Sequence, residues 1–407
     1  MPSDRMQKAL AGQLAALDRE GRRKGAETVT TAVLPAEGDR GPRILIDGEG
    51  DRAFLRMNSN GYLGMALRSE VIAAEEEAVR KFGVGPQAVR FISGSFASHV
   101  DLERRLSAFH AREAAMIFSS AYATVMGILP SLITNETAVI SDELNHNCII
   151  NAIRLAGPAA KYVYPHLDLA GLESALESAA GTCQRALVVT DGIFSMRGDH
   201  APLHEIEDLA RRFDEHFPQN VVVVVDDSHG VGAFGETGRG TEEFCAASAD
   251  ILVATLGKAL GVNGGYVVGS AVLVEYLREV APFYVYSNPI TPGEAASASK
   301  ALELLDGPCG RGLLAHLREM TLRFERGIMA LGYETIPSPH PVVPCLVRDS
   351  PRTAALVEHL RAQSILATGL AYPIVPRGDE EVRFQISADH TRADIDEALT
   401  ALASFER

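Results

Sequence analysis

Short runs of apolar, mostly β-branched residues alternate with helical patterns between about residue 70 and residue 280. The expected strands are AAMIFSS, TAVIS, AKYVYP, RALVVTDG, NVVVVVDDSHG, ILVATLG and GGYVVGS, and the segments between them include the helical patterns ERRLSAFHA, LESALESAA and HEIEDLARRFDEHF. Strands that alternate with helices favour an α/β fold with a mainly parallel sheet, covered on both faces. The run VVVVV is typical of a central strand in such a sheet.

The two ends of the chain follow other patterns. The elements expected there are helices near 3–25, 292–306, 311–331, 351–363 and 391–405, and short strands in RILIDG, PVVPCLVRD and EVRFQISA. We therefore expect three segments: an N-terminal helix with short strands over 1–55, a large α/β domain over 56–295, and a smaller C-terminal α+β domain over 296–407.

Composition and charge narrow the class of protein. The 407 residues are 46% hydrophobic, which is enough to bury a sizeable core. The net charge of -15 argues against nucleic acid or an anionic membrane surface as the main partner, because both require clustered positive charge. No segment approaches the length of a membrane span. The five cysteines contain no C-x-x-C pair, which indicates neither a disulfide framework nor a metal cluster and favours the cytoplasm.

Polar residues follow the ends of several predicted strands. VVVVV leads to Asp226 and His229, RALVVT leads to Asp191 and Ser195, and ILVAT leads to Lys258. The carboxyl ends of parallel strands lie at one edge of the sheet, where ligands bind in open α/β folds. Each residue alone has an ordinary explanation, such as an Asp that caps a turn. Together they predict a functional site at this edge.

Two nucleotide-binding motifs are weak alternatives. GVGAFG at 230–235 matches G-x-G-x-x-G, but a dinucleotide fingerprint places its glycines in the first turn after the strand and opens a helix. Here DDSH precedes the glycines and ETGRGTEE follows them, which favours a turn-rich loop over a dinucleotide site. A Walker loop is not predicted, since Ala259 follows Lys258 and the upstream glycine is missing.

Lys258 lies among small and apolar residues in VATLGKALGVNGGYVVG. Desolvation lowers the pKa of such a lysine, which makes its amine a nucleophile for an aldehyde. Pyridoxal 5'-phosphate (PLP) is an aldehyde cofactor that also needs an acid opposite its ring nitrogen and donors for its phosphate. Asp226 is a candidate for the acid. The amides of SSAYAT at 119–124 are candidates for the phosphate site, although an ordinary serine N-cap explains that stretch equally well.

Longer motifs extend in order along nearly the whole chain. They are SNGYLGMA at 59–66, VRFISGSFASHVDLE at 89–103, SDELNHNCIINAIRLA at 141–156, TDGIFSMRGDHAPL at 190–203, VDDSHGVGAFGETGRG at 225–240, ATLGKALGVNGGY at 254–266, YVYSNPITP at 284–292 and YPIVPRGDEEVRFQISADHT at 372–391. This set resembles the α-oxoamine synthases, PLP-dependent transferases of fold type I that join an amino acid to an acyl-CoA with loss of CO2. Within that family the similarity is closest to the 2-amino-3-ketobutyrate CoA ligases, or glycine C-acetyltransferases.

The resemblance implies catalytic roles for four residues. Lys258 resembles the lysine that forms an imine with PLP, and Asp226 the partner of the pyridine nitrogen. His146 resembles the histidine that stacks on the cofactor ring, although a satisfied structural histidine is the alternative. His229, together with the cofactor-binding Ser195, corresponds to the groups near the phenolic oxygen and the imine.

The resemblance also implies binding residues. Those for the cofactor phosphate are the amides of Ala121 and Tyr122, the hydroxyl of Thr255, and Ser287 from a partner subunit, so a homodimer is implied. Arg383 matches the arginine that holds the amino-acid carboxylate, for which bidentate geometry is suited, with a solvated strand arginine as the alternative. Asn60 matches a substrate-side asparagine.

Four features depart from the usual pattern of the family or are notable within it. Gly61 stands where Asn or Asp is usual, Pro86–Ala88 lengthens the loop before Val89, and Asp389 replaces an alanine. Val89 is bulky and apolar at a position that borders the amino-acid side chain in this family. It predicts a small amino acid, with glycine as the first choice.

The predicted function is therefore PLP-dependent condensation of glycine with an acyl-CoA, acetyl-CoA as the first choice, to give an aminoketone or amino-keto acid. Long-chain condensations of the 8-amino-7-oxononanoate synthase or serine palmitoyltransferase type are alternatives. An aminotransferase would use Lys258 and Asp226 without a thioester. A non-catalytic subunit of the same fold typically lacks the lysine that this chain keeps.

Overall fold

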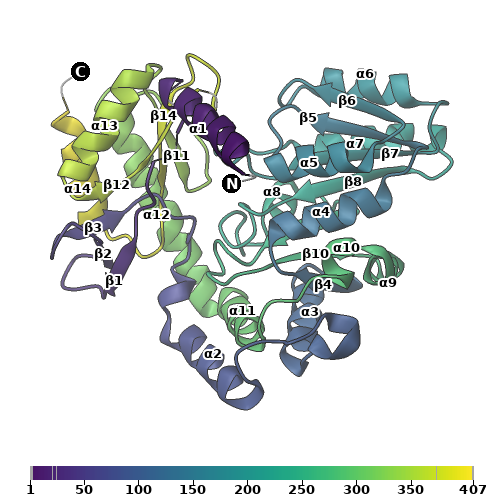
Figure 1. Ribbon diagram of the computed structural model, residues 1–407, viewed down its shortest axis with the longest axis horizontal. Helices are drawn as coiled ribbons and strands as arrows, with labels where there is room; N and C mark the ends of the chain where they lie inside the picture. Colours follow the sequence, from purple (N-terminus) through teal and green to yellow (C-terminus); the bar gives the residue numbers. More distant parts are fainter. Residues whose placement is uncertain (1–2, 21, 24, 373, 406–407) are drawn as a thin grey trace.

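A central sheet organises the larger part of the molecule (Figure 1). The computed structural model describes residues 3–20, 22–23, 25–372 and 374–405, and within them seven strands pair in the order β4-β10-β9-β8-β7-β5-β6. The strands are β4 Ala114–Phe118, β5 Thr137–Asp142, β6 Ala160–Tyr164, β7 Arg185–Asp191, β8 Val221–Asp226, β9 Ile251–Thr255 and β10 Gly265–Gly269. Only β10 runs antiparallel to its neighbours in this set. The predicted strands and their mainly parallel pairing are confirmed.

Helices pack on both faces of this sheet because successive strand residues are apolar on opposite faces. Val224 packs with residues of α4, α5 and α9, whereas Val223 and Val225 pack with residues of α6 and α7. The helices of this part are α2 Ser69–Phe82, α3 Ala97–Phe109, α4 Ala121–Leu132, α5 Asn147–Ala156, α6 Leu169–Ala179, α7 Leu203–Phe213, α8 Thr241–Cys245, α9 Ala271–Val280, α10 Pro282–Val285 and α11 Pro292–Leu305, with short 3-10 or π turns η1 Met65–Leu67, η2 Arg90–Gly94 and η3 Asp214–His216. The run VVVVV is thus buried from both sides, as predicted.

The smaller part combines two short sheets with three helices (Figure 1). Its elements are β11 Val342–Leu346, β14 Glu381–Gln385 and β13 Thr368–Leu370 in one antiparallel sheet, β1 Thr30–Leu34, β2 Arg43–Ile46, β3 Ala53–Arg56 and β12 Ile365–Leu366 in the other, and helices α12 Pro308–Ala330, α13 Ser350–Ala362 and α14 Arg392–Ala403. One apolar cluster contains Leu252 of β9 and Phe384 of β14. The two parts therefore share a core, which fixes β14 beside the large sheet.

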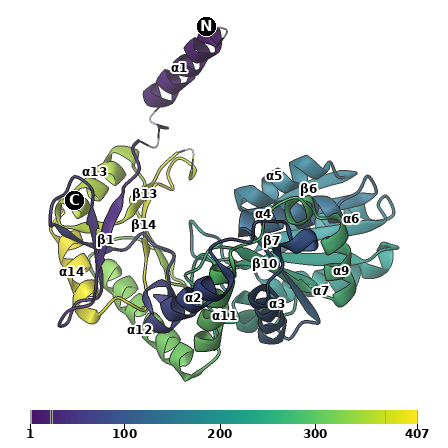
Figure 2. The same ribbon diagram turned by 60° about the horizontal axis from the view of Figure 1, so that its bottom comes forward.

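The N-terminal helix is shorter than predicted. Helix α1 spans Asp4–Arg19, buries none of its residues and extends away from the body of the molecule (Figure 2). The prediction of helix to residue 25 was wrong at residues 20, 22, 23 and 25, while residues 21 and 24 lie outside the described part. Two glycines in GRRKG weaken the helix there, because glycine is among the poorest helix formers.

The expected domain limits fall within continuous structure. Residue 295 lies inside α11, and β3, which ends at Arg56, pairs with β12 of the C-terminal segment. The division at 55 and 295 stays a prediction.

Among the described helices, none has both the length and the apolar character that crossing a bilayer requires.

Candidate active site

Lys258 lies beside two buried carboxylates at the carboxyl edge of the large sheet. Asp191 and Asp226 end β7 and β8 and are register partners, and Lys258 follows β9. Burial lowers the pKa of Lys258, and Asp226 and Asp191 act in the opposite direction, so that the pKa is about 8. A minor but substantial fraction of the amine, about one tenth at pH 7, is therefore neutral, and the neutral amine is the state that attacks an aldehyde.

The two carboxylates have different environments. Burial raises the pKa of Asp191, and the neighbouring Asp226 raises it further. Asp226 accepts hydrogen bonds from the Ser228 amide at 3.1 Å and from the Cys148 thiol at 3.8 Å. Burial and a neighbouring carboxylate both disfavour the ionised form, so Asp191 favours its protonated form.

His229 is buried and held from two sides. Its Nδ1 lies 2.7 Å from the Tyr62 hydroxyl, and its carbonyl oxygen accepts a hydrogen bond from His340 Nε2 at 3.0 Å. Burial lowers the pKa of His229, and Lys258 lowers it further, so the ring is neutral. Burial also raises the pKa of Tyr62, which keeps its hydroxyl protonated. The Tyr62 contact therefore fixes the orientation of a neutral imidazole.

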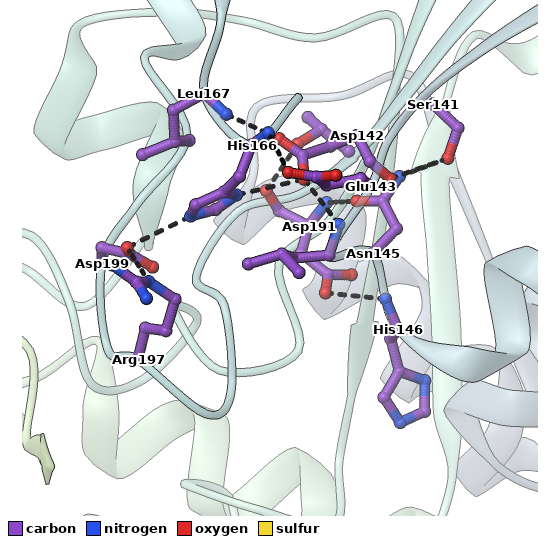
Figure 3. A network of polar contacts seen from close by, with 12 residues as sticks. Ser141, Asp142, Glu143, Asn145, His146, His166, Leu167, Asp191, Arg197 and Asp199 are labelled. Carbon is purple, nitrogen blue, oxygen red and sulfur yellow. Dashed lines mark hydrogen bonds and ion pairs between the residues drawn. The ribbon is translucent and has the colours of Figure 1, made fainter. Parts of the chain in front are cut away.

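His146 is the N-cap of α5 and presents an exposed ring. Its backbone amide donates to Asp191 Oδ2 at 3.0 Å, and its Nδ1 lies 2.9 Å from Cys148 Sγ. Figure 3 shows the ring extending away from the polar network that surrounds Asp191. The ring thus lies near the carboxylates but leaves its face available for stacking.

The N-terminus of α4 supplies backbone donors at the same edge. The side chain of Ser120 caps the helix by accepting from the Ala123 amide at 3.0 Å, and the preceding amides of Ala121 and Tyr122 lie in the first turn, where no intrahelical acceptor exists. A Cβ at Gly265 would lie 2.3 Å from the Ala121 nitrogen, so only glycine permits β10 to approach this helix end. The arrangement is suited to an anion.

Thr255 completes this part of the site from β9. Its hydroxyl accepts from the Gly257 amide at 3.0 Å and donates to the Gly264 carbonyl at 3.1 Å. These bonds tie the turn that precedes Lys258 to the segment that leads into β10. Thr255 therefore shapes the loop that carries the lysine.

Arg383 reaches the site from β14 of the smaller part. Its Nη1 donates to the Ser195 carbonyl at 2.7 Å, and its charge lowers the pKa of both Lys258 and His229. Gln385, with its amide oxygen turned toward the guanidinium, accepts from Arg383 Nη2 at 2.9 Å. Asn60 Oδ1 lies 3.3 Å from the Tyr62 hydroxyl. A guanidinium, an amide, an amine and an imidazole thus meet at the junction of the two parts.

Comparison with known proteins agrees with this geometry. Residues 52–402 match the family of aminotransferases of class I and II. The chain is 38% identical over 401 residues to the mitochondrial 2-amino-3-ketobutyrate coenzyme A ligase of Homo sapiens, with 98% of this chain and 91% of the relative covered. It is 37% identical over 371 residues to 8-amino-7-oxononanoate synthase of Thermosipho melanesiensis, with 91% and 92% covered.

Serine palmitoyltransferase of Sphingomonas wittichii has the same fold, with a TM-score of 0.87, 26% identity, and 99% and 97% of the two chains covered. The chain belongs to the class I and II aminotransferase family. Its relatives are α-oxoamine synthases, so the predicted resemblance, the fold type I architecture and the dependence on PLP are confirmed.

The site residues of this family member fit PLP by their chemistry. A partly neutral lysine amine, a buried carboxylate, an exposed imidazole face and a helix N-terminus are the four groups that the aldehyde, the pyridine nitrogen, the ring and the phosphate require. Lys258, Asp226, His146 and the amides of Ala121 and Tyr122 supply them from separate elements of one sheet edge.

Two predicted residues lie outside this cluster. Ser287 follows α10, and Val89 precedes η2, which packs against α10. The Ser287 hydroxyl faces its neighbour's carbonyl, Asn288 O, at 3.5 Å. Within one chain these residues belong to the α10–η2 surface and not to the Lys258 cluster.

The glycine motif at 230–235 forms turns, and the helix that follows it is the short α8. No helix opens at the fingerprint itself, so the structure favours the predicted turn-rich loop over a dinucleotide site. A separate groove of about 1130 Å³ lies at the amino ends of β7, β8 and β9, and no predicted site residue lines it.

Sequence reasoning missed four side chains that support the site. Asp191 was recognised at a strand end but received no role, whereas Tyr62, Cys148 and Gln385 lie within quoted motifs that gave no indication of their contacts. Gln385 had a usable signal, since it lies two residues after Arg383 on one strand and therefore on the same face.

Proposed function

We propose that the protein is a PLP-dependent acyltransferase that condenses glycine with an acyl-CoA, acetyl-CoA first, and releases CoA thiol. The product is an amino-keto acid, or an aminoketone where CO2 is lost. The observation that carries the proposal is the meeting of Lys258, Asp226 and Arg383 at one sheet edge. The acyl-CoA class is supported by the 38% identity to a 2-amino-3-ketobutyrate coenzyme A ligase. Glycine is supported by that relative and by the bulk of Val89.

Arg383 would bind the carboxylate of the amino acid. The Ser195 carbonyl and the Gln385 amide hold its guanidinium in one orientation, which leaves its remaining donors for a bidentate contact. A carboxylate fixed there restricts rotation of the amino acid about its Cα bonds. Restricting that rotation decides which bond at Cα is broken.

Lys258 would accept the Cα proton. PLP, when bound, supplies an electron sink conjugated with Cα. A pKa of about 8 suits the amine to exchange a proton near neutral pH. Tyr62 and His229 would supply a neutral hydrogen-bond donor to the cofactor, and Asp226 would keep the ring nitrogen protonated.

The active unit would be a homodimer in which Ser287 and Val89 reach the partner's site. Three large apolar side chains near these residues are solvent-exposed in the single chain: Tyr286 at 81%, Phe91 at 69% and Ile92 at 68%. Exposed apolar groups of this size are typical of interfaces.

We propose that the protein is cytoplasmic, because its free thiols at Cys148, Cys183, Cys245 and Cys309 suit a reducing compartment.

Thiol release tests the proposal. A panel of acyl-CoAs from acetyl to palmitoyl would be incubated with glycine, alanine and serine, and free thiol would be measured with Lys258→Ala as the control. Glycine with acetyl-CoA should react fastest. Amine transfer to a 2-oxo acid without thiol release would contradict the proposal and identify an aminotransferase. A preference for long acyl chains would change the proposed acyl-CoA from acetyl-CoA to a longer one and leave the reaction class as proposed.

A further inference from the structure

His166 joins two loops of the active-site edge through both of its ring nitrogens (Figure 3). It follows β6, and its Nδ1 lies 3.1 Å from Asp142 Oδ1 while its Nε2 lies 3.1 Å from Asp199 Oδ2. Phe194 packs against the ring edge-on, with a centroid distance of 4.4 Å. Both nitrogens face carboxylate oxygens, which accept and cannot donate when ionised, so the geometry is that of an imidazolium with two N–H donors.

Asp142 connects His166 to the loop of His146. Its carboxylate also accepts from the amides of Leu144 at 2.8 Å and Leu167 at 2.9 Å. Asn145, two residues before α5, accepts from the Asp191 amide at 2.8 Å, and Asp191 Oδ2 in turn accepts from the His146 amide at 3.0 Å. The turn that Asp142 organises therefore delivers the predicted stacking histidine.

Asp199 connects His166 to the loop that contacts Arg383. This loop contains Ser195, whose carbonyl oxygen accepts from Arg383 Nη1 at 2.7 Å. Asp199 Oδ2 also accepts from Arg197 Nε at 2.9 Å, whereas Asp199 Oδ1 is buried and has no hydrogen-bond partner in the described part of the chain. His166 and Arg197 thus supply the hydrogen bonds and the positive charge that compensate the negative charge of the Asp199 carboxylate.

The backbone beside His166 is strained. Leu167 adopts a φ of 59°, a left-handed conformation that L side chains rarely adopt, and the Asp142 carboxylate holds its amide. Strain of this kind persists only where surrounding contacts fix the segment. Here the fixed segment places the imidazole between two carboxylates from different loops.

The charges around His166 agree with this geometry. Burial alone would lower the pKa of His166, but hydrogen bonds to Asp142 and Asp199 outweigh it and raise the pKa to about 9. Burial acts to raise the pKa of Asp199, and its bonds to His166 and Arg197 prevail and lower it. The other titratable groups near the ring are Glu143, which accepts the His166 amide at 2.8 Å, and Tyr164, at the end of β6.

We propose that His166 is a positioning residue that locks the Ser195 loop to the His146 loop and thereby holds Arg383 in the orientation that binds the amino-acid carboxylate. The proposal rests on the proposed function in one respect, the role of Arg383. His166 lies on a third loop, away from the reacting atoms, and sets the affinity for the amino acid through the charge that it carries.

Replacing His166 by Gln removes the charge and one of the two bonds. The matched control is His216→Gln, at an exposed histidine after α7. In the PLP-loaded protein, titration of glycine followed by the absorbance change should give a Kd about tenfold weaker for His166→Gln, the effect of losing one charge-assisted hydrogen bond, and an unchanged Kd for the control. An unchanged Kd for His166→Gln would overturn the proposal. This readout needs no acyl-CoA, so a protein that binds glycine but releases no thiol contradicts the proposed function alone.

Thermal unfolding without substrate supplies the second readout. The pKa of His166 is higher in the folded chain than the unfolded value of about 6.5, so its contribution to stability is complete below that pH and disappears as the pH rises through about 9. The Tm difference between wild type and His166→Gln should follow this course. A Tm difference that does not change with pH would show that His166 is not charged in the folded protein and would contradict the proposal. If His166→Gln does not fold, Asp199→Asn removes the same ion pair with little change in volume and should weaken glycine binding equally; unchanged binding would again refute the proposal.

Discussion

Lys258 illustrates how a single side chain acquires its chemistry from its surroundings. Burial disfavours its charged form, while Asp226 and Asp191 favour that form, and the balance leaves a pKa of about 8. An amine of this kind is a much better nucleophile at neutral pH than a solvated lysine. The environment, and not the residue type alone, therefore sets the fraction of neutral amine.

The rate of PLP attachment to the cofactor-free protein should report this pKa. About one tenth of the amine is neutral at pH 7 and about nine tenths at pH 9, so the rate should rise across this range and then level off. Stopped-flow absorbance over pH 6 to 10.5 measures it. A rate that still increases about eightfold between pH 9 and 10 is the course expected for an unperturbed lysine of pKa 10.5 and would contradict the account.

Arg383 is the second test at the scale of residues. Lysine in its place keeps the charge but loses the planar pair of donors, so the KM for glycine should rise about 10- to 100-fold while the KM for the acyl-CoA stays near its wild-type value. Arg377→Lys, at an exposed arginine on the same segment, is the control. Equal effects on both substrates would indicate a structural role for Arg383.

Residues differ in how far the sequence predicted them. Asp226, His229 and Lys258 were accessible because each follows an apolar run that had to be a strand, and such ends meet at one edge. Tyr62 and His166 were not, because their partners lie far away in sequence. The contacts of Tyr62 with His229 and of His166 with Asp199 exist only after the chain has folded.

At the scale of elements, the continuous apolar runs of the large sheet predicted their strands well, since burial on both faces allows few other structures. Helix α1 was predicted too long because the expected range included the segment GRRKG at 21–25, whose glycines disfavour a helix, whereas the helix ends at Arg19. The contact between β10 and the N-terminus of α4 was beyond prediction, as it joins segments that the sequence separates by more than a hundred residues.

That contact makes Gly265 a test of the proposed phosphate site. A methyl group there would meet the Ala121 nitrogen at 2.3 Å and push the helix end away, so Gly265→Ala should weaken the affinity for PLP by about tenfold, or about 1.4 kcal/mol. Gly312→Ala in α12 meets nothing within 4 Å and should bind PLP normally. An unchanged affinity for PLP in Gly265→Ala would show that the N-terminus of α4 does not bind the phosphate.

At the scale of the whole molecule, the single chain supplies most of the site but leaves Ser287 and Val89 on a different surface. The shared core that contains Leu252 and Phe384 fixes Arg383 beside Lys258 within one chain. The α10–η2 surface, with Tyr286 exposed, is the part where the proposed second copy would pack.

Mixing two inactive variants tests the shared site. Lys258→Ala removes the amine, and Ser287→Asp places a negative charge where the partner's phosphate would lie. After random exchange of subunits, half of the dimers are mixed and each carries one intact site, so about a quarter of the wild-type activity should return. No recovery, with mixed dimers verified by mass spectrometry, would show that Ser287 acts within its own chain or not at all.

The central claim is that one amine at the end of β9 carries the cofactor. Borohydride reduction of the PLP-loaded protein followed by peptide mapping tests it most directly. The pyridoxyl group should be found on the peptide that contains Lys258, and the Lys258→Ala variant should show no such label. A label on another lysine, or an unlabelled Lys258 in protein that holds PLP, would contradict the account.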